Sequence, residues 1–69
     1  MNYGELTRKL QQQGIELRRQ AKGSHEIWWH PDKRLYTRIT NHGSQEIKKG
    51  TLARILKDLG LSEEDLAGK

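Results

Sequence analysis

The chain has 69 residues, enough for one domain but too few for a deep enclosed cleft, so any active site is expected on an open surface. It has no cysteine, which excludes a disulfide framework and a thiolate-rich zinc site. Its 13 Lys and Arg outnumber its 9 Asp and Glu. The resulting net charge of +4 favours a nucleic acid or an acidic protein as partner over an ordinary solvated surface.

The first predicted element is a helix over Tyr3–Gln13. Asn2 and Glu5 have the spacing of a capping box, which satisfies backbone N–H groups at a helix start. Apolar residues then recur at helical spacing, at Tyr3, Leu6 and Leu10. Gly14 is expected to end the helix in a left-handed conformation, and Ile15 to pack back on its last apolar residue, as in a Schellman motif.

Three strands are predicted next, over 15–19, 26–30 and 35–39, because apolar and polar residues alternate or aromatic residues cluster there. Residues 21–24 and 31–33 are read as turns around Gly23 and Pro31. In the middle strand we expect Ile27 and Trp29 to face the core. Trp28 would then point outward and contact a partner or RNA.

The last helix has the clearest pattern, an apolar stripe formed by Leu52, Ile55, Leu56 and Leu59. Gly60 ends it with the same device as Gly14, and residues 62–67 are read as a short capped turn with Leu66 packed inward. The order α-β-β-β-α predicts an α+β fold over residues 1–69. It is a three-stranded antiparallel meander with both helices on one face and the other face free for a partner.

The tight turn Gly23-Ser24-His25 places a histidine at the start of the aromatic strand, within a basic part of the chain. Imidazole exchanges protons near neutral pH, and RNA supplies its own nucleophile in the 2′-hydroxyl. A general acid or base beside positive charge is therefore enough for a minimal ribonuclease. The alternative is that His25 is only a solvent-exposed residue at a strand end.

Other candidate groups carry weaker signals. Lys48 and Lys49 at the start of the last helix suggest a phosphate site, or else a solvated pair near Glu46. The spacing of His25, His30 and His42 matches no metal-ligand motif, so no metal site is expected. We expect His30 to lie in a hairpin. His42 is expected to order the turn before the last helix, and either of these two histidines is a candidate accessory proton donor.

The sequence resembles the HicA toxins, the small ribonucleases of bacterial HicA–HicB toxin–antitoxin pairs, over nearly its whole length. The resemblance rests on the triplet Gly23-Ser24-His25, on His42-Gly43, and on the run from Glu46-Ile47 through Gly50-Thr51-Leu52 to Ile55-Leu56-Lys57. Two features depart from the pattern. Trp28-Trp29 is heavier than the usual single aromatic residue, and Asn41 precedes His42 where an aliphatic residue is common. Neither departure affects His25, so they bear on partner specificity more than on activity.

This resemblance implies a fold similar to a double-stranded-RNA-binding domain and cleavage of mRNA independently of the ribosome, with His25 as the catalytic residue. It also implies a HicB-like antitoxin that covers the His25 face and binds operator DNA. We therefore expect a metal-independent endoribonuclease acting on single-stranded mRNA, without a cofactor. Its RNA contacts are predicted at Lys22, Gly23, Ser24, Lys48 and Lys49.

Two other classes remain open at this point, a non-catalytic RNA-binding module and a protein-interaction domain. The RNA-binding module fits the basic face, whereas the protein-interaction domain would explain an exposed Trp28 but not the basic turn, and neither needs a positioned histidine. The N-terminus is polar and no apolar run is long enough to cross a membrane, so a cytoplasmic protein is expected.

Overall fold

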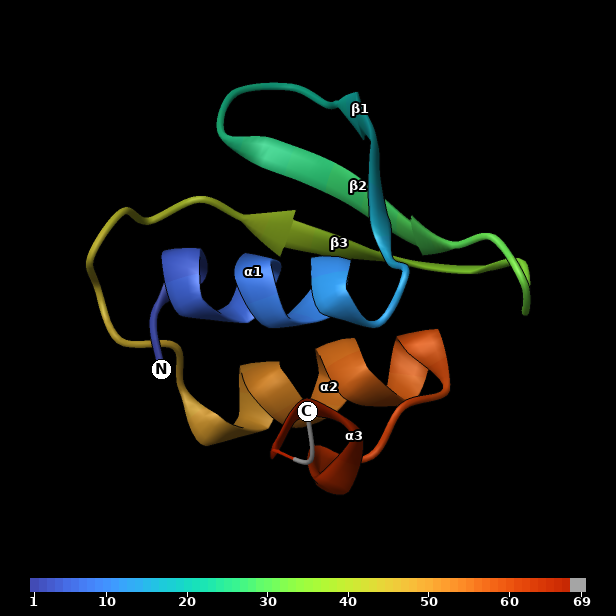
Figure 1. Cartoon of the computed structure of the whole chain (residues 1–69). Helices are drawn as coiled ribbons and strands as arrows, with labels where there is room; N and C mark the ends of the chain where they lie inside the picture. The colour runs from blue at the N-terminus through green and yellow to red at the C-terminus, as the bar shows by residue number, and fades with distance from the viewer. Residues whose placement is uncertain (68–69) are drawn as a thin grey trace.

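All helices lie on one side of a three-stranded antiparallel sheet (Figure 1). A computed structural model describes residues 1–67. The elements follow in the order α1 (Tyr3–Gln12), β1 (Glu16–Gln20), β2 (His25–His30), β3 (Leu35–Thr40), α2 (Lys49–Leu59) and α3 (Glu63–Ala67). This order confirms the predicted α-β-β-β-α fold, with the capped turn after α2 forming a third, short helix. None of the helices in the described part of the chain is long and apolar enough to span a membrane.

The same backbone device ends α1 and α2. After α1, Gly14 has φ 88°, and the N–H of Ile15 donates to the carbonyl of Leu10 over 2.9 Å. After α2, Gly60 has φ 70°, and the N–H of Leu61 donates to the carbonyl of Leu56 over 2.9 Å. These bonds are those of a Schellman motif, so the predicted stops are confirmed, as is the capping box of α1.

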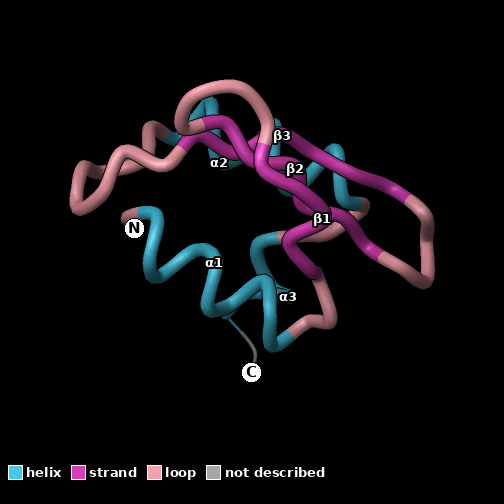
Figure 2. Tube along the Cα trace, turned by 90° about the horizontal axis from the view of Figure 1, so that it is seen from above, coloured by secondary structure: helices cyan, strands magenta, loops and turns pink. Residues whose placement is uncertain are grey.

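The sheet has the order β1-β2-β3, so β2 is central and the other two strands form the edges (Figure 2). β1 begins at Glu16, one residue later than predicted, because Ile15 completes the stop of α1 and is buried. Leu17 pairs with Trp28, whereas Arg19, two residues later, pairs with Ile27, which is only one residue away from Trp28 in β2. One residue of β1, Arg18, is therefore extra, which makes this position a β-bulge.

Trp28 is buried, with 3% of its surface exposed, so the predicted outward orientation of this residue is wrong. Cross-strand partners in an antiparallel sheet point to the same face, and Trp28 pairs with Thr37, which is 2% exposed. The indole N–H donates to the carboxylate of Glu26 over 3.0 Å, so its polar end is satisfied within the core. The partner contact expected at Trp28 required an exposed side chain, so the burial of Trp28 removes the reason for it. Trp29 lies on the opposite, outer face of the sheet.

The core lies between the helices and the inner face of β2 and β3. Its buried apolar residues come from all three helices, the two strands and the first loop: Leu6, Leu10, Ile15, Trp28, Ile39, Ile55, Leu56, Leu59 and Leu66. In β3 the alternation of buried and exposed residues places Thr37 and Ile39 inward, as predicted. Arg38, between them, is exposed.

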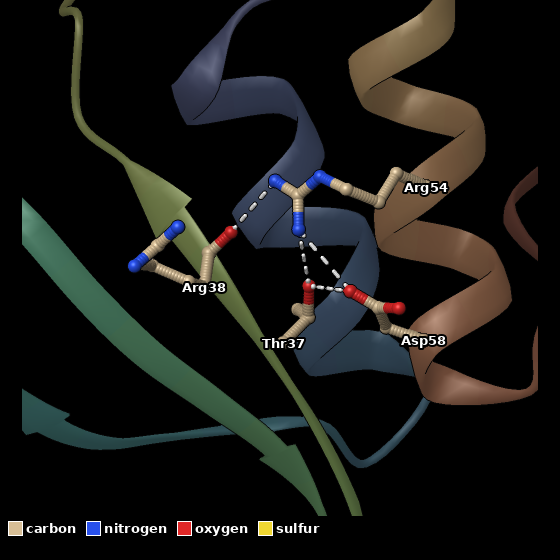
Figure 3. A network of polar contacts seen from close by, with 4 residues as sticks. All are labelled: Thr37, Arg38, Arg54 and Asp58. Carbon is tan, nitrogen blue, oxygen red and sulfur yellow. Dashed lines mark hydrogen bonds and ion pairs between the residues drawn. The ribbon is translucent and has the colours of Figure 1, made fainter.

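A four-residue polar network fastens α2 to β3 (Figure 3). The guanidinium of Arg54 donates to the carboxylate of Asp58 over 3.1 Å and to the backbone carbonyl of Arg38 over 3.1 Å. The hydroxyl of Thr37 donates to the same carboxylate oxygen over 2.8 Å. Arg54 thus joins α2 to β3 and also donates to a backbone carbonyl of β3, which is an edge strand.

Candidate functional site

His25 is the first residue of β2, and its side chain is exposed. It pairs across the sheet with Thr40, the last residue of β3, and its Nδ1 lies 3.1 Å from the Thr40 hydroxyl. Because this contact engages Nδ1, Nε2 is the ring nitrogen left for a ligand. The imidazole is therefore both oriented by the protein and open to solvent, as a proton-transfer group must be.

The turn before His25 brings three of the predicted site residues together. Lys22, Gly23 and Ser24 are all exposed, and Gly23 has φ 66°, a left-handed conformation that favours glycine. The turn is held on both sides: the side-chain amide of Gln20 donates to the Gly23 carbonyl over 3.2 Å, and the Asn41 N–H donates to the Ser24 carbonyl over 3.0 Å. Together these contacts fix the direction in which the chain enters β2.

Lys48 and Lys49 lie elsewhere, at the start of α2 on the helix side of the sheet. Both side chains are exposed, no side chain caps this helix start, and its first turn contains no acidic residue. No hydrogen bond or ion pair within residues 1–67 joins either lysine to His25. The predicted lysines and the predicted histidine therefore come from different elements, α2 and β2.

Thr40 is nevertheless common to both regions. It also lines a cleft of about 460 Å³ between the end of β3 and the start of α2, where His42, Lys48 and Arg54 contribute further polar walls. A phosphate in this cleft would lie beside the residue that contacts His25. The accessory proton donor expected at His42 stays a prediction, now with a place in the cleft wall.

A second, shallower groove crosses the outer face of the sheet. Its lining combines three arginines with two aromatic residues and an isoleucine: Arg18, Arg19, Arg34, Trp29, Tyr36 and Ile27. The guanidinium carbon of Arg18 lies 4.4 Å from the centroid of the Trp29 ring, within cation–π distance. Sequence reasoning missed this groove. The signal was present in β3, because an inward Thr37 puts Tyr36 outward.

A buried polar cluster lies directly behind His25. Glu26 is 6% exposed, and its carboxylate accepts hydrogen bonds from the hydroxyl of Tyr3 and the indole of Trp28. The pKa of Tyr3 is raised to about 12, mainly by burial. The hydrogen bond to Glu26 and the negative charge of the Glu26 carboxylate act in the same direction. This cluster links α1 to the start of β2, and no periodic pattern of residues indicated it.

The three histidines occupy separate positions. His30 is buried at the end of β2, where its Nδ1 accepts a hydrogen bond of 3.4 Å from the Lys33 backbone, in agreement with the predicted hairpin role. His25 lies on the outer face and His42 in the cleft wall. Within the described residues, no three His, Asp or Glu side chains gather as ligands for a metal ion.

A family model described as HicA toxin of bacterial toxin-antitoxin matches residues 3–61, which include β2, the cleft and all of α2. No curated protein and no solved structure matches the chain.

Proposed function

The chain belongs to the HicA toxins of bacterial toxin–antitoxin systems, and from this we propose that it is an endoribonuclease that cleaves mRNA with His25 as its catalytic residue. The observation that carries this proposal is the exposed imidazole of His25, held through Nδ1 by Thr40 at the end of a basic, glycine-containing turn. A side chain that served only stability would not need to be both fixed and open to solvent.

In the proposed reaction, Nε2 of His25 takes the proton from a ribose 2′-hydroxyl. The 2′-oxygen then forms a bond to the adjacent phosphorus, and the bond from phosphorus to the 5′-oxygen breaks. The leaving oxygen receives a proton from water or from His42. The products are a 2′,3′-cyclic phosphate and a 5′-hydroxyl, and no metal ion takes part. Nδ1 must carry a proton for Nε2 to act as base, so the Thr40 hydroxyl accepts from Nδ1 in this state.

Positive charge near the phosphate supports this chemistry, because negative charge builds up on the phosphate oxygens in the transition state. Lys22 lies in the same turn as His25 and is the nearest cation in the sequence. Gly23 and Ser24 expose backbone to a sugar–phosphate chain that approaches the turn. We place Lys48 and Lys49 in a second role, as contacts for RNA that continues past Thr40 toward α2.

Membership of the family implies a HicB antitoxin as partner. We propose that the antitoxin covers the outer face with His25, and that the target is mRNA in the cytoplasm, cut independently of the ribosome. Such a cover blocks the site without any rearrangement of the core. Trp28 takes no part in this contact because it is buried.

The test is cleavage of an end-labelled mRNA by purified protein in excess EDTA, with a His25→Ala variant prepared in parallel. Cleavage by the native chain alone, leaving a 2′,3′-cyclic phosphate, supports the proposal. A 5′-phosphate product or a strict need for magnesium contradicts the mechanism. Equal cleavage by both proteins indicates a contaminating nuclease. RNA binding without cleavage in both indicates an RNA-binding module, and the absence of salt-sensitive binding indicates a protein-interaction domain.

A further inference from the structure

We propose that the groove on the outer face of the sheet binds single-stranded RNA, with bases stacked on Tyr36 and on the Arg18 guanidinium that lies over Trp29, and phosphates held by Arg19 and Arg34. This site deepens the proposed function and rests on it for the role of the bound strand as substrate. The binding itself is argued from the groove alone.

The aromatic part of the groove is a cross-strand pair. Trp29 and Tyr36 are direct partners in the β2–β3 register, so their rings leave the sheet on the same side and next to each other. Tyr36 is 67% exposed, so its ring is open to a ligand. Stacking on exposed aromatic rings is how proteins bind unpaired bases without sequence preference. Bases in a duplex are already stacked and paired, so this pair favours a single strand.

The bulge in β1 explains why two consecutive arginines reach one groove. Successive residues of a regular strand point to opposite faces, so Arg18 and Arg19 would normally separate. Because Arg18 is the extra residue of the bulge, both line the groove beside Trp29. None of the residues lining the groove is acidic, which makes its charge complementary to phosphate.

Arg34 reaches the groove from the β2–β3 turn at a conformational cost. It has φ 58°, and it is the one non-glycine residue with positive φ in the described part of the chain. A side chain in the left-handed region is disfavoured relative to glycine, which the chain uses at its other left-handed positions. An arginine kept where glycine suits the backbone better points to a use for its side chain.

The groove leads to His25. Residues 25, 27 and 29 lie on the same face of β2 because side chains alternate along a strand. Four residues of strand span about 13 Å, so an RNA stacked on the Arg18 guanidinium over Trp29 needs to extend only a short distance to reach the imidazole. The groove would therefore anchor the substrate at one end of the sheet while His25 acts at the other.

The experiment measures binding of a fluorescein-labelled oligouridylate by anisotropy, with every protein carrying His25→Ala so that the RNA stays intact. Tyr36→Ala should weaken binding by about ten-fold, and the effect should disappear with an abasic strand of equal length. Arg34→Gly should weaken binding and reduce its salt dependence, yet raise the melting temperature because the strained φ is relieved. Arg8→Ala, at an exposed position of α1, lowers the net charge by the same amount as Arg34→Gly and should leave the affinity for RNA nearly unchanged.

Weaker binding in a more stable protein cannot arise from misfolding, so Arg34→Gly separates a binding role from a structural one. The proposal is overturned if Tyr36→Ala and Arg34→Gly bind RNA as tightly as the parent, or if a blunt RNA duplex of equal length binds better than the single strand. The outer face would then be assigned to a protein partner. If the chain with His25 intact binds RNA through the groove but does not cleave it, the proposed function is contradicted, whereas the groove remains an RNA-binding site.

Discussion

Thr40 and His25 face each other across the β2–β3 pair, and the hydroxyl of one contacts Nδ1 of the other over 3.1 Å. The contact joins the last residue of one strand to the first of its neighbour. It orients the imidazole without burying it. In the proposed reaction Thr40 is therefore a positioning residue, because it acts through His25 and does not touch the reacting atoms.

Thr40→Val is expected to lower kcat by about ten-fold with little change in KM, because the ring loses the hydrogen-bond partner that orients it. The pH dependence of kcat should shift as well, which a simple packing defect would not cause. Thr40→Ser keeps the hydroxyl and should restore most of the activity. Full activity in the Val variant together with loss of activity in the Ser variant would show that the methyl group, and not the hydrogen bond, matters.

Tyr3→Phe is expected to lower the free energy of unfolding by about 1 kcal/mol, because Glu26 loses one of its two hydrogen-bond donors. The pKa of Tyr3 is raised from 10.0 to about 12, so its contribution is complete below pH 10 and is lost as pH rises toward 12. The difference in stability between parent and variant should therefore shrink over that window.

Urea unfolding of both proteins across this pH range measures the effect. Tyr36→Phe is the matched control because Tyr36 is exposed on the sheet. It should alter stability little at any pH. A difference between Tyr3→Phe and parent that stays constant from pH 10 to 12 would contradict the assignment.

Trp28→Ala is expected to cost about 3–5 kcal/mol, because it leaves a cavity in the core and removes a donor from Glu26. Tyr36→Ala, at an exposed position, should change stability by no more than about 0.5 kcal/mol. Thermal unfolding of the two variants compares them directly. Similar melting temperatures would mean that the two faces of the sheet had been assigned the wrong way round.

Arg54→Ala is expected to lower the free energy of unfolding by about 1–2 kcal/mol. Its ion pair with Asp58 is half-exposed and worth little, so most of the loss should come from the contact with the Arg38 carbonyl and from the effect on Thr37. Arg54→Lys should recover only part, because an ammonium cannot reproduce the forked guanidinium contacts. Full recovery of stability in Arg54→Lys would show that only the positive charge at this position matters and that the forked hydrogen bonds do not. Lys57→Ala, an exposed residue of the same helix, is the control.

The sequence predicted helices, stops and element order well because these depend on local signals. A capping residue, an apolar stripe and a left-handed glycine each act within a few residues of chain, as around Leu10, Gly14 and Ile15. His25 and its turn were predicted for the same reason. Their contiguity in sequence makes them neighbours in any fold.

The faces of the sheet were harder to predict. Ile27, Trp28 and Trp29 are all apolar, so alternation could not show which of them points inward. The answer depends on the pairing of Trp28 with Thr37, which is fixed by the length of the hairpin between them. The bulge at Arg18 and the cluster around Glu26 depend on contacts between distant parts of the chain.

Because side chains alternate along β2, its residues form two groups, one on the outer face of the sheet and one in the core. His25, Ile27 and Trp29 lie on the outer face, whereas Glu26, Trp28 and His30 are buried. A His25→Ala variant should thus keep its shape, since no core contact is removed. Under the proposed function this variant is inactive, so it could be produced in quantity and used as bait to isolate a HicB antitoxin.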